Sequence, residues 1–282
     1  MFNKKYKEES MEQLEHSIGV YNWAYSLVTE KAEKLFNIRL NSGEKVIKPV
    51  EEYINQLANS PKEFNKSFSN YKIEFEIFND LVEAFNAESI DTTVKAGGTA
   101  VAGVVAGAGT AALMPSVALG IATTFGTAST GTAISSLTGA AASKAALAWL
   151  GGGALAKGGA GIVGGKALLA LAGPIGIGIG AVSVIGGGLL ASSKNKKSAM
   201  EINEKDKEIQ TQTKVLYASE KEVDSLIDLT NTHQEGILRL LNELKVSGGK
   251  NYSEFSVSEK EKVGALINHM ASLSSLLNKK VS

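Results

Sequence analysis

The chain has 282 residues, enough for one large or two modest domains, and its 29 basic and 29 acidic side chains leave no net charge. This balance argues against a general nucleic-acid binder, which needs a basic excess on one face. The absence of cysteine excludes disulfides and thiolate metal sites.

The first zone, residues 1–91, is predicted to hold two long amphipathic helices, because its apolar residues recur at alternating steps of three and four. The first series is Met11, Leu14, Ile18, Tyr21, Tyr25, Val28, Ala32 and Leu35, and the second is Phe64, Phe68, Tyr71, Phe75, Phe78, Val82 and Phe85. The stretch 41–43 and Pro49 predict a break between them. Two helices with a short connection are expected to pack antiparallel.

The middle zone, residues 92–193, differs from both flanks in composition. No acidic residue occurs between Asp91 and Glu201, and this stretch holds 24 of the 30 glycines. Ala96–Met114 and Ala167–Ser193 are uncharged and long enough to cross a bilayer, which needs about 20 apolar residues. The sequence therefore predicts a hairpin-like apolar domain that inserts into a membrane. A third uncharged piece, Ser116–Ser143, is rich in Thr and Ser and is expected to be amphiphilic.

Small residues in this zone recur at spacings that place them on one helix face. Such stripes allow helix backbones to approach closely, which is a common basis of association within membranes. The stripe therefore predicts homo-oligomerisation. The residues predicted for insertion and helix packing are Gly103, Gly107, Gly173, Gly176, Ile179, Gly180, Ser183 and Gly187.

The only charged residues in and around the middle zone are lysines, which are predicted to lie at the membrane interface. The favoured interpretation is snorkelling of the ammonium groups toward headgroups, and the alternative is that some of them line a pore. The predicted interfacial residues are Lys95, Lys144, Lys157, Lys166, Lys194, Lys196 and Lys197.

The third zone, residues 194–282, is again predicted to be helical. Residues at steps of seven from Ile202 to Leu244 favour a buried seam, while Lys205, Gln212 and Ser219 make the companion positions of its first half poor. Gly248 and Gly249 are expected to end this helix. A last helix is predicted after Ser256 or Ser258, with a capping-box spacing from Ser258 to Glu261. Its apolar face is Val263, Ile267, Met270, Leu273 and Leu277.

Catalytic, metal and cofactor sites are not predicted anywhere in the chain. The three histidines, His16, His233 and His269, lie far apart on separate predicted helices, where each is expected to be an ordinary surface or core histidine. The glycine-rich string Gly161–Ala167 lacks the first glycine and the final Ser or Thr of a phosphate-binding loop. We therefore expect a protein that is not an enzyme and that binds no nucleotide.

Long polar helices on both sides of an apolar, Gly/Ala-rich insert predict an all-α fold in three parts, 1–91, 92–193 and 194–282. This layout resembles α-helical pore-forming toxins of the cytolysin A and hemolysin BL class, and also the apolipoprotein L proteins and colicin pore domains. The resemblance implies a bacterial toxin or effector that inserts into a lipid bilayer and oligomerises into a pore. The first nine residues show no Sec-type signal, so we expect cytosolic synthesis followed by membrane association, either after export by another route or from a form that is soluble before insertion.

Two other functions are compatible with the same patterns. The first is a constitutive two-span membrane protein whose cytoplasmic helical wings bind a helical partner, and it would never be soluble without detergent. The second is a soluble helical interaction protein with a core of unusually small residues, which would remain monodisperse in water and ignore lipid. Neither needs a nucleic acid or a cofactor.

Overall fold

The computed structural model describes residues 2–95, 115–126, 128, 130–137, 141–142, 144–146, 195–247 and 249–281. These residues are almost entirely helical and contain no strand, only isolated bridges such as the one between Ala58 and Asn251, so the predicted all-α class is confirmed. In chain order the elements are α1 (Phe2–Leu40), the π-helical turn η1 (Gly43–Ile47), α2 (Lys48–Gln56), α3 (Lys62–Lys95), α5 (Pro115–Phe125), the 3-10 turn η2 (Ile134–Ser136), α9 (Asn195–Ser247), the 3-10 turn η5 (Tyr252–Glu254) and α10 (Val257–Leu277).

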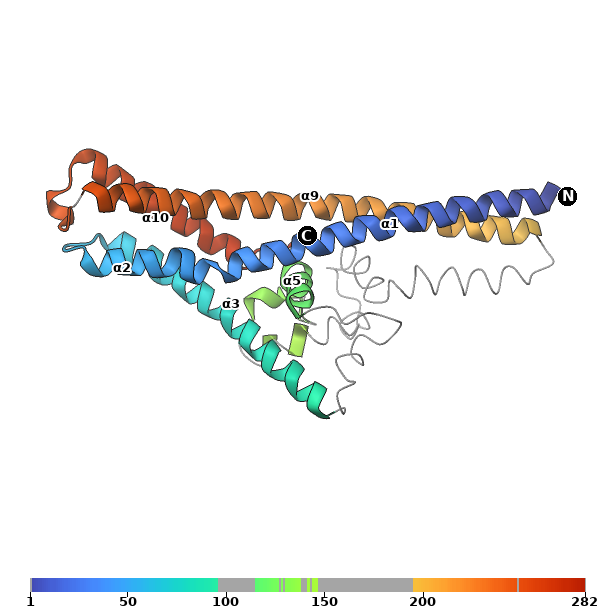
Figure 1. Cartoon of the computed structure of the whole chain (residues 1–282), viewed down its shortest axis with the longest axis horizontal. Helices are drawn as coiled ribbons and strands as arrows, with labels where there is room; N and C mark the ends of the chain where they lie inside the picture. The colour runs from blue at the N-terminus through green and yellow to red at the C-terminus, as the bar shows by residue number, and fades with distance from the viewer. Residues whose placement is uncertain are drawn as a thin grey trace.

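Two helices that are far apart in the sequence, α1 and α9, lie side by side along the longest axis of the molecule (Figure 1). The Tyr6 hydroxyl accepts a hydrogen bond from the Asn203 amide at 2.9 Å, and the Ile38 carbonyl accepts one from the Gln234 amide at 3.3 Å. Residue numbers therefore rise together along both helices, which makes the pair parallel. We call this pair the rod.

The seven-residue repeat of α9 faces the interior, as the sequence predicts: all its members from Ile202 to Leu244 are buried. The companion positions agree with the prediction only in part. Lys205 is exposed, whereas Asp206, one residue further along, is buried; Gln212 is half-buried beside the buried Thr213, and Ser219 is buried as predicted. The step from the repeat position is thus four residues at Ile202 and three at Leu216, and the companion positions of this half are polar.

The chain does not break at residues 41–43, because Ser42 and Lys48 keep helical backbone angles and η1 carries the chain into α2. The predicted antiparallel pairing of the first two long helices is also wrong. α3 packs mainly along α10, and it meets α1 where the rings of Phe36 and Phe78 lie 5.6 Å apart. Heptad spacing thus identifies the buried face of α3, but it does not identify the helix that covers it.

α9 and α10 form an antiparallel hairpin, with an ion pair of 2.9 Å between Lys262 and Glu243. The capping box of α10 begins at Ser256, two residues before the predicted Ser258–Glu261 spacing. The Ser256 hydroxyl accepts a hydrogen bond from the Glu259 backbone N–H at 3.3 Å, and the Glu259 carboxylate accepts one from the Ser256 N–H at 2.8 Å. Hydrogen bonds from the Ser256 side chain and backbone hold the pKa of Glu259 below its usual value.

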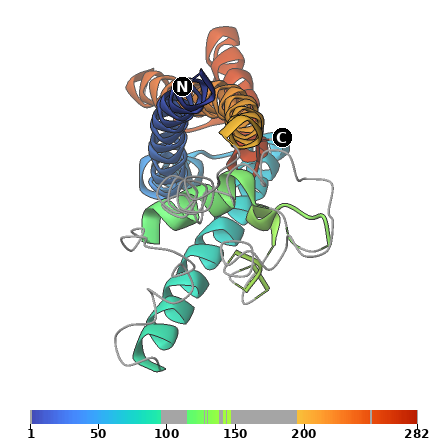
Figure 2. The same cartoon turned by 90° about the vertical axis from the view of Figure 1, so that its right-hand side faces the viewer.

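Part of the middle zone packs on the bundle through α5, which crosses beside the rod (Figure 2). At Gly120 the two backbones approach so closely that a β-carbon would lie 2.9 Å from backbone atoms of Ala32 and Glu33. Hydrophobic side chains of this segment enter the common core, which explains why a piece expected to be amphiphilic is sheltered here. The buried ones are Leu119, Ile121, Ala122, Phe125 and Ile134.

The segment after α10 joins α1 and α5 through hydrogen bonds centred on Arg39, whose side chain is 0% exposed. Its Nη2 donates to the carbonyl oxygens of Leu276 at 2.8 Å and Lys279 at 2.7 Å. The Val281 N–H donates to the Thr124 carbonyl of α5 at 2.8 Å. Burial lowers the pKa of Arg39 to about 9, so the guanidinium stays protonated at neutral pH and caps the carbonyl end of α10.

Candidate interaction surface on the helix rod

The distal half of the rod, residues 5–24 of α1 and 199–217 of α9, extends past α5 and α10 toward the N-terminus (Figure 1). Its interior mixes apolar side chains, such as Leu14 and Ile209, with polar ones. The Asp206 carboxylate is buried and accepts hydrogen bonds from the side chains of Gln13 at 3.1 Å and Gln210 at 2.8 Å, both on the same oxygen. Its other oxygen has no hydrogen-bond partner among the described residues. The buried polar residues of the seam are Lys7, Ser10, Ser17, Asp206 and Thr213, and they lie among the buried apolar residues Leu14, Ile18, Tyr21, Ile202, Ile209 and Leu216.

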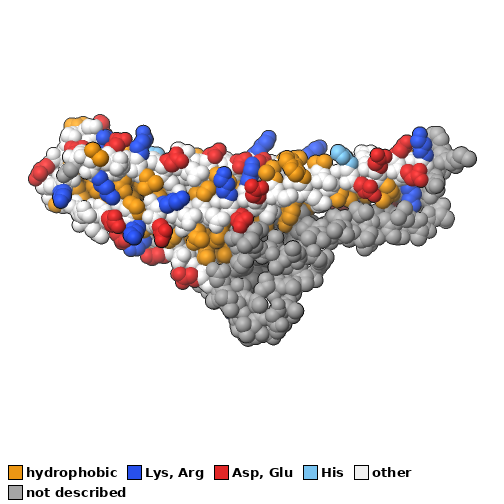
Figure 3. All heavy atoms as spheres, in the orientation of Figure 1, with side chains coloured by type: hydrophobic (Ala, Val, Ile, Leu, Met, Phe, Trp, Pro, Cys, Tyr) orange, Lys and Arg blue, Asp and Glu red, His pale blue; other side chains and the backbone are white. Residues whose placement is uncertain are grey.

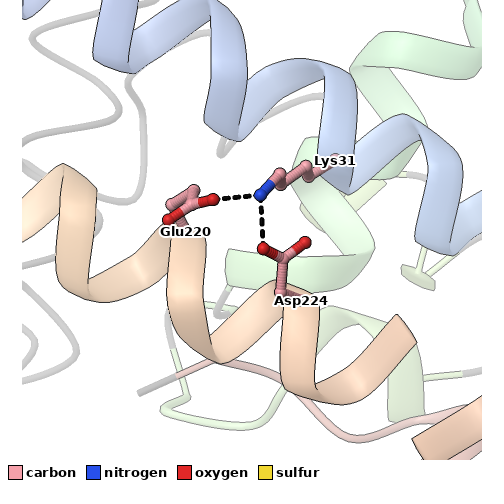
Figure 4. A network of polar contacts seen from close by, with 3 residues as sticks. All are labelled: Lys31, Glu220 and Asp224. Carbon is pink, nitrogen blue, oxygen red and sulfur yellow. Dashed lines mark hydrogen bonds and ion pairs between the residues drawn. The ribbon is translucent and has the colours of Figure 1, made fainter. Parts of the chain in front are cut away.

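A charged clamp marks the inner end of this half. The Lys31 ammonium of α1 reaches across to the carboxylates of Glu220 and Asp224 on α9 and pairs with both (Figure 4). Burial opposes the charged ammonium, but the hydrogen bonds that it donates to Asp224 and Glu220 outweigh this effect and raise the pKa of Lys31. The clamp therefore fixes the register of the two parallel helices at neutral pH.

Large hydrophobic side chains are exposed to solvent on the surface of the distal half, outside this seam. Trp23 is 59% exposed and its ring lies 6.2 Å from that of Tyr217, while Met200 is 61% exposed. Tyr6 is also exposed and contacts Asn203, one turn beyond Met200. Asn203 and Tyr217 are two heptads apart and share one side of α9, about 21 Å apart along its axis. We call the surface made by Tyr6, Trp23, Met200 and Tyr217 the outer face.

Charges of opposite sign lie on the two helices beside the outer face. On α9, Lys207, Lys214 and Lys221 follow Met200 at steps of seven, all are exposed, and none forms an ion pair with a described residue. On α1 the exposed Glu12 and Glu15 stand in a stretch without Lys or Arg between residues 8 and 30. Figure 3 shows surface hydrophobic side chains set among charged groups along the rod.

A second cluster lies on the α9–α10 hairpin, where His233 and His269 meet. Their Nδ1 atoms are 2.9 Å apart, and their ring planes lie at 67° to each other. Burial, and then the neighbouring His269, lower the pKa of His233. The expectation that the histidines lie apart is therefore wrong for this pair. The signal was present in the sequence, because both stand at similar distances from the turn at Gly249.

A shallow hollow of about 330 Å³ lies between α2 and the end of α9, with Tyr53, Leu57 and Lys245 in its wall. The Tyr53 hydroxyl is buried without a hydrogen-bond partner in the described part of the chain. Burial, and then the charge of Glu259, raise the pKa of Tyr53 to about 12, so the hydroxyl is neutral.

Few of the residues singled out for membrane insertion can be placed. Lys144 is exposed, and Lys95, Lys196 and Lys197 belong to the backbones of α3 and α9. The remaining predicted positions lie outside the described residues: Gly103, Gly107, Lys157, Lys166, Gly173, Gly176, Ile179, Gly180, Ser183, Gly187 and Lys194.

Membrane insertion is the main prediction that the structure contradicts. No helix in the part of the chain that the structure describes is long and apolar enough to cross a membrane. α1, α3 and α9 are long but carry charged residues throughout, and α5 is apolar but has only 11 residues. This finding overturns the expected membrane-inserting, pore-forming function, the two-span alternative and the predicted membrane-associated localisation. The proposed spans Ala96–Met114 and Ala167–Ser193 themselves lie outside the described residues.

Comparisons with protein-family models, with curated proteins and with solved structures found no match to this chain. The resemblance to pore-forming toxins therefore rests on the order of the three sequence zones alone. The function has to be argued from the surfaces described above.

Proposed function

We propose that this chain is a helical interaction protein that associates with a second copy of itself, side by side, through the outer face of the rod. One observation carries the proposal: in the distal half the α1–α9 seam buries polar as well as apolar side chains, while Tyr6, Trp23 and Met200 remain exposed outside it. Large aromatic and aliphatic side chains left on the outside of a helix pair favour a further helix as their cover. A second helix pair placed on the outer face provides that cover.

Trp23 is the central contact of this surface. Tryptophan and tyrosine dominate the energetics of protein interfaces because they bury a large area in few rotamers. The Trp23 ring already contacts Tyr217 on the neighbouring helix, so it is held in place before a partner arrives. Covering the exposed part of this side chain contributes about 2–3 kcal/mol on the area scale.

A second copy fits this surface because the rod carries complementary charges of its own. In a twofold pairing every contact between the two chains occurs twice. One copy's α9 can therefore lie against the other's α1, while its own α1 lies against the other's α9. Lys207, Lys214 and Lys221 then face the stretch that contains Glu12 and Glu15. Such pairs add specificity and salt dependence more than affinity. No catalytic step is part of this proposal.

The proposal predicts that Trp23→Ala weakens self-association at least tenfold, measured by sedimentation velocity over a range of concentrations. Val257→Ala is the matched control, because Val257 is 75% exposed and lies on α10, away from the distal half. Lys214→Glu is expected to weaken association as well, whereas Lys66→Glu on α3 leaves it unchanged. Equal association of Trp23→Ala and Val257→Ala, or a wild type that stays monomeric at every concentration, contradicts the proposal.

A further inference from the structure

We propose that His233 and His269 form a two-imidazole binding site for a divalent late transition-metal ion that favours square-planar coordination, Cu²⁺ above all. The site lies on the α9–α10 hairpin, away from the distal half of the rod, and does not depend on the proposed self-association. Imidazole nitrogen is a preferred ligand of copper, nickel and zinc, and copper binds tightest in this series.

The separation of the two nitrogens matches the geometry of such a site. Two metal–nitrogen bonds of about 2.0–2.1 Å at a right angle place the nitrogens about 2.9 Å apart, whereas tetrahedral coordination places them about 3.3 Å apart. The Nδ1 atoms of His233 and His269 are 2.9 Å apart. A square-planar ion bound to both Nδ1 atoms displaces the hydrogen-bonding proton of one ring, and the two rings turn so that both lone pairs point at the ion while the two nitrogens keep their separation.

The backbone makes room for this arrangement. The His269 ring packs on Gly236, where a β-carbon would lie 2.6 Å from the ring. Glycine within a helix costs about 1 kcal/mol of helix stability relative to alanine. Gly236 therefore destabilises α9 slightly, but it leaves the space in which the two rings meet. Both rings are only half-buried, which leaves space for water on the remaining coordination positions.

The rest of the chain offers little competition for the metal. The chain has no cysteine and only one other histidine, His16, which is exposed on α1. Within the described ranges no group of three or more His, Asp or Glu side chains is arranged to hold a metal ion. The protein therefore supplies two ligands, and the site is expected to bind Cu²⁺ reversibly rather than as a permanent structural metal.

The test is a titration of the full chain with Cu²⁺ by isothermal calorimetry in a weakly competing buffer. We expect one ion per chain, with at least tenfold weaker binding for His233→Gln and for His269→Gln. His16→Gln is the matched control and is expected to bind as the wild type does. Unchanged affinity in His269→Gln, or an equal loss in His16→Gln, overturns the proposal.

Two further measurements do not depend on replacing a histidine. Electron paramagnetic resonance of the wild-type complex with one Cu²⁺ is expected to show hyperfine splitting from two imidazole nitrogens, and a spectrum with fewer contradicts the site. Gly236→Ala keeps both histidines but displaces the His269 ring, so it is expected to weaken Cu²⁺ binding at least tenfold. Gly264→Ala in α10, where a β-carbon meets nothing within 4 Å, is expected to leave binding unchanged. Equal binding by the two glycine variants counts against the proposed geometry.

Discussion

Arg39→Ala is expected to lower the free energy of unfolding by about 3–5 kcal/mol. The substitution removes two charge-assisted hydrogen bonds, each contributing about 1.5–3 kcal/mol, and takes the Arg39 donor from the Lys279 carbonyl, while the Leu276 carbonyl keeps its backbone N–H donors. It also empties the volume of a side chain that is fully buried between α1 and the end of α10.

The measurement is urea unfolding at neutral pH, followed by circular dichroism. Arg239→Ala is the matched control, because Arg239 is the only other arginine and is exposed on α9. Arg39→Lys is expected to lose less than Arg39→Ala, since an ammonium can still reach one carbonyl. If Arg39→Ala and Arg239→Ala unfold at the same urea concentration, Arg39 does not anchor the segment after α10.

Gly120→Ala is expected to destabilise the protein by about 2–3 kcal/mol and to loosen α5 from α1. The added β-carbon would lie 2.9 Å from backbone atoms of Ala32 and Glu33. Backbone atoms in the middle of a 39-residue helix cannot move aside as a flexible side chain can, so the two helices have to separate.

Hydrogen exchange localises this effect. The Val281 N–H donates to the Thr124 carbonyl of α5, so its exchange is expected to accelerate in Gly120→Ala along with the amides of α5. Gly19→Ala is the control, because a β-carbon there meets nothing within 4 Å, and it is expected to stabilise the chain by about 0.5–1 kcal/mol. If the Gly120→Ala and Gly19→Ala variants have the same free energy of unfolding, the close contact between α5 and α1 is contradicted.

Helix faces were predictable from spacing, whereas helix partners were not. The apolar series of α1, α3, α9 and α10 supply most of the core, because a seven-residue period fixes which side of a helix is buried. The period does not indicate whether two helices run parallel or antiparallel, or which helix covers a given buried face. The sequence therefore suggested a short antiparallel pair within residues 1–91, while α1 instead runs parallel to α9, a helix that begins more than 150 residues later.

In the distal half the spacing does not fix which neighbour of a repeat position is buried. A step of three from Ile202 points to Lys205, whereas the structure turns Asp206 inward, where the side chains of Gln13 and Gln210 donate hydrogen bonds to its carboxylate. Further along, Ser219 is buried at a step of three from Leu216. Arg39 had no sequence signal at all, since its partners are carbonyls of a segment more than 230 residues away. Contacts between a side chain and backbone carbonyls that are distant in the sequence cannot be predicted from residue spacing and become visible only in the folded structure.

The membrane prediction weighed the composition of the middle zone above everything else. Part of that zone, α5 with η2, is placed in the common core by Leu119, Phe125 and Ile134. The Thr123 hydroxyl donates to the Leu119 carbonyl at 2.7 Å and the Ser135 hydroxyl to the Asn278 carbonyl at 2.8 Å, whereas the buried Thr124 hydroxyl has no partner among the described residues. A segment rich in small residues can therefore allow two helices to pack closely inside a protein, as α5 does against α1. Composition alone does not distinguish membrane insertion from close helix packing inside a protein.

Pulsed electron paramagnetic resonance between chains tests the central claim, that two rods pair through the outer face. The chain has no cysteine, so Gln210→Cys places one spin label between the two ends of the outer face. We expect a dipolar signal between labels of different chains, with a separation of roughly 20–40 Å for helix pairs packed at about 10 Å between axes. The signal should vanish when labelled chains are diluted with an excess of unlabelled chains. A label at Gln210 that shows no interchain signal at a concentration where the chain is dimeric would contradict the account.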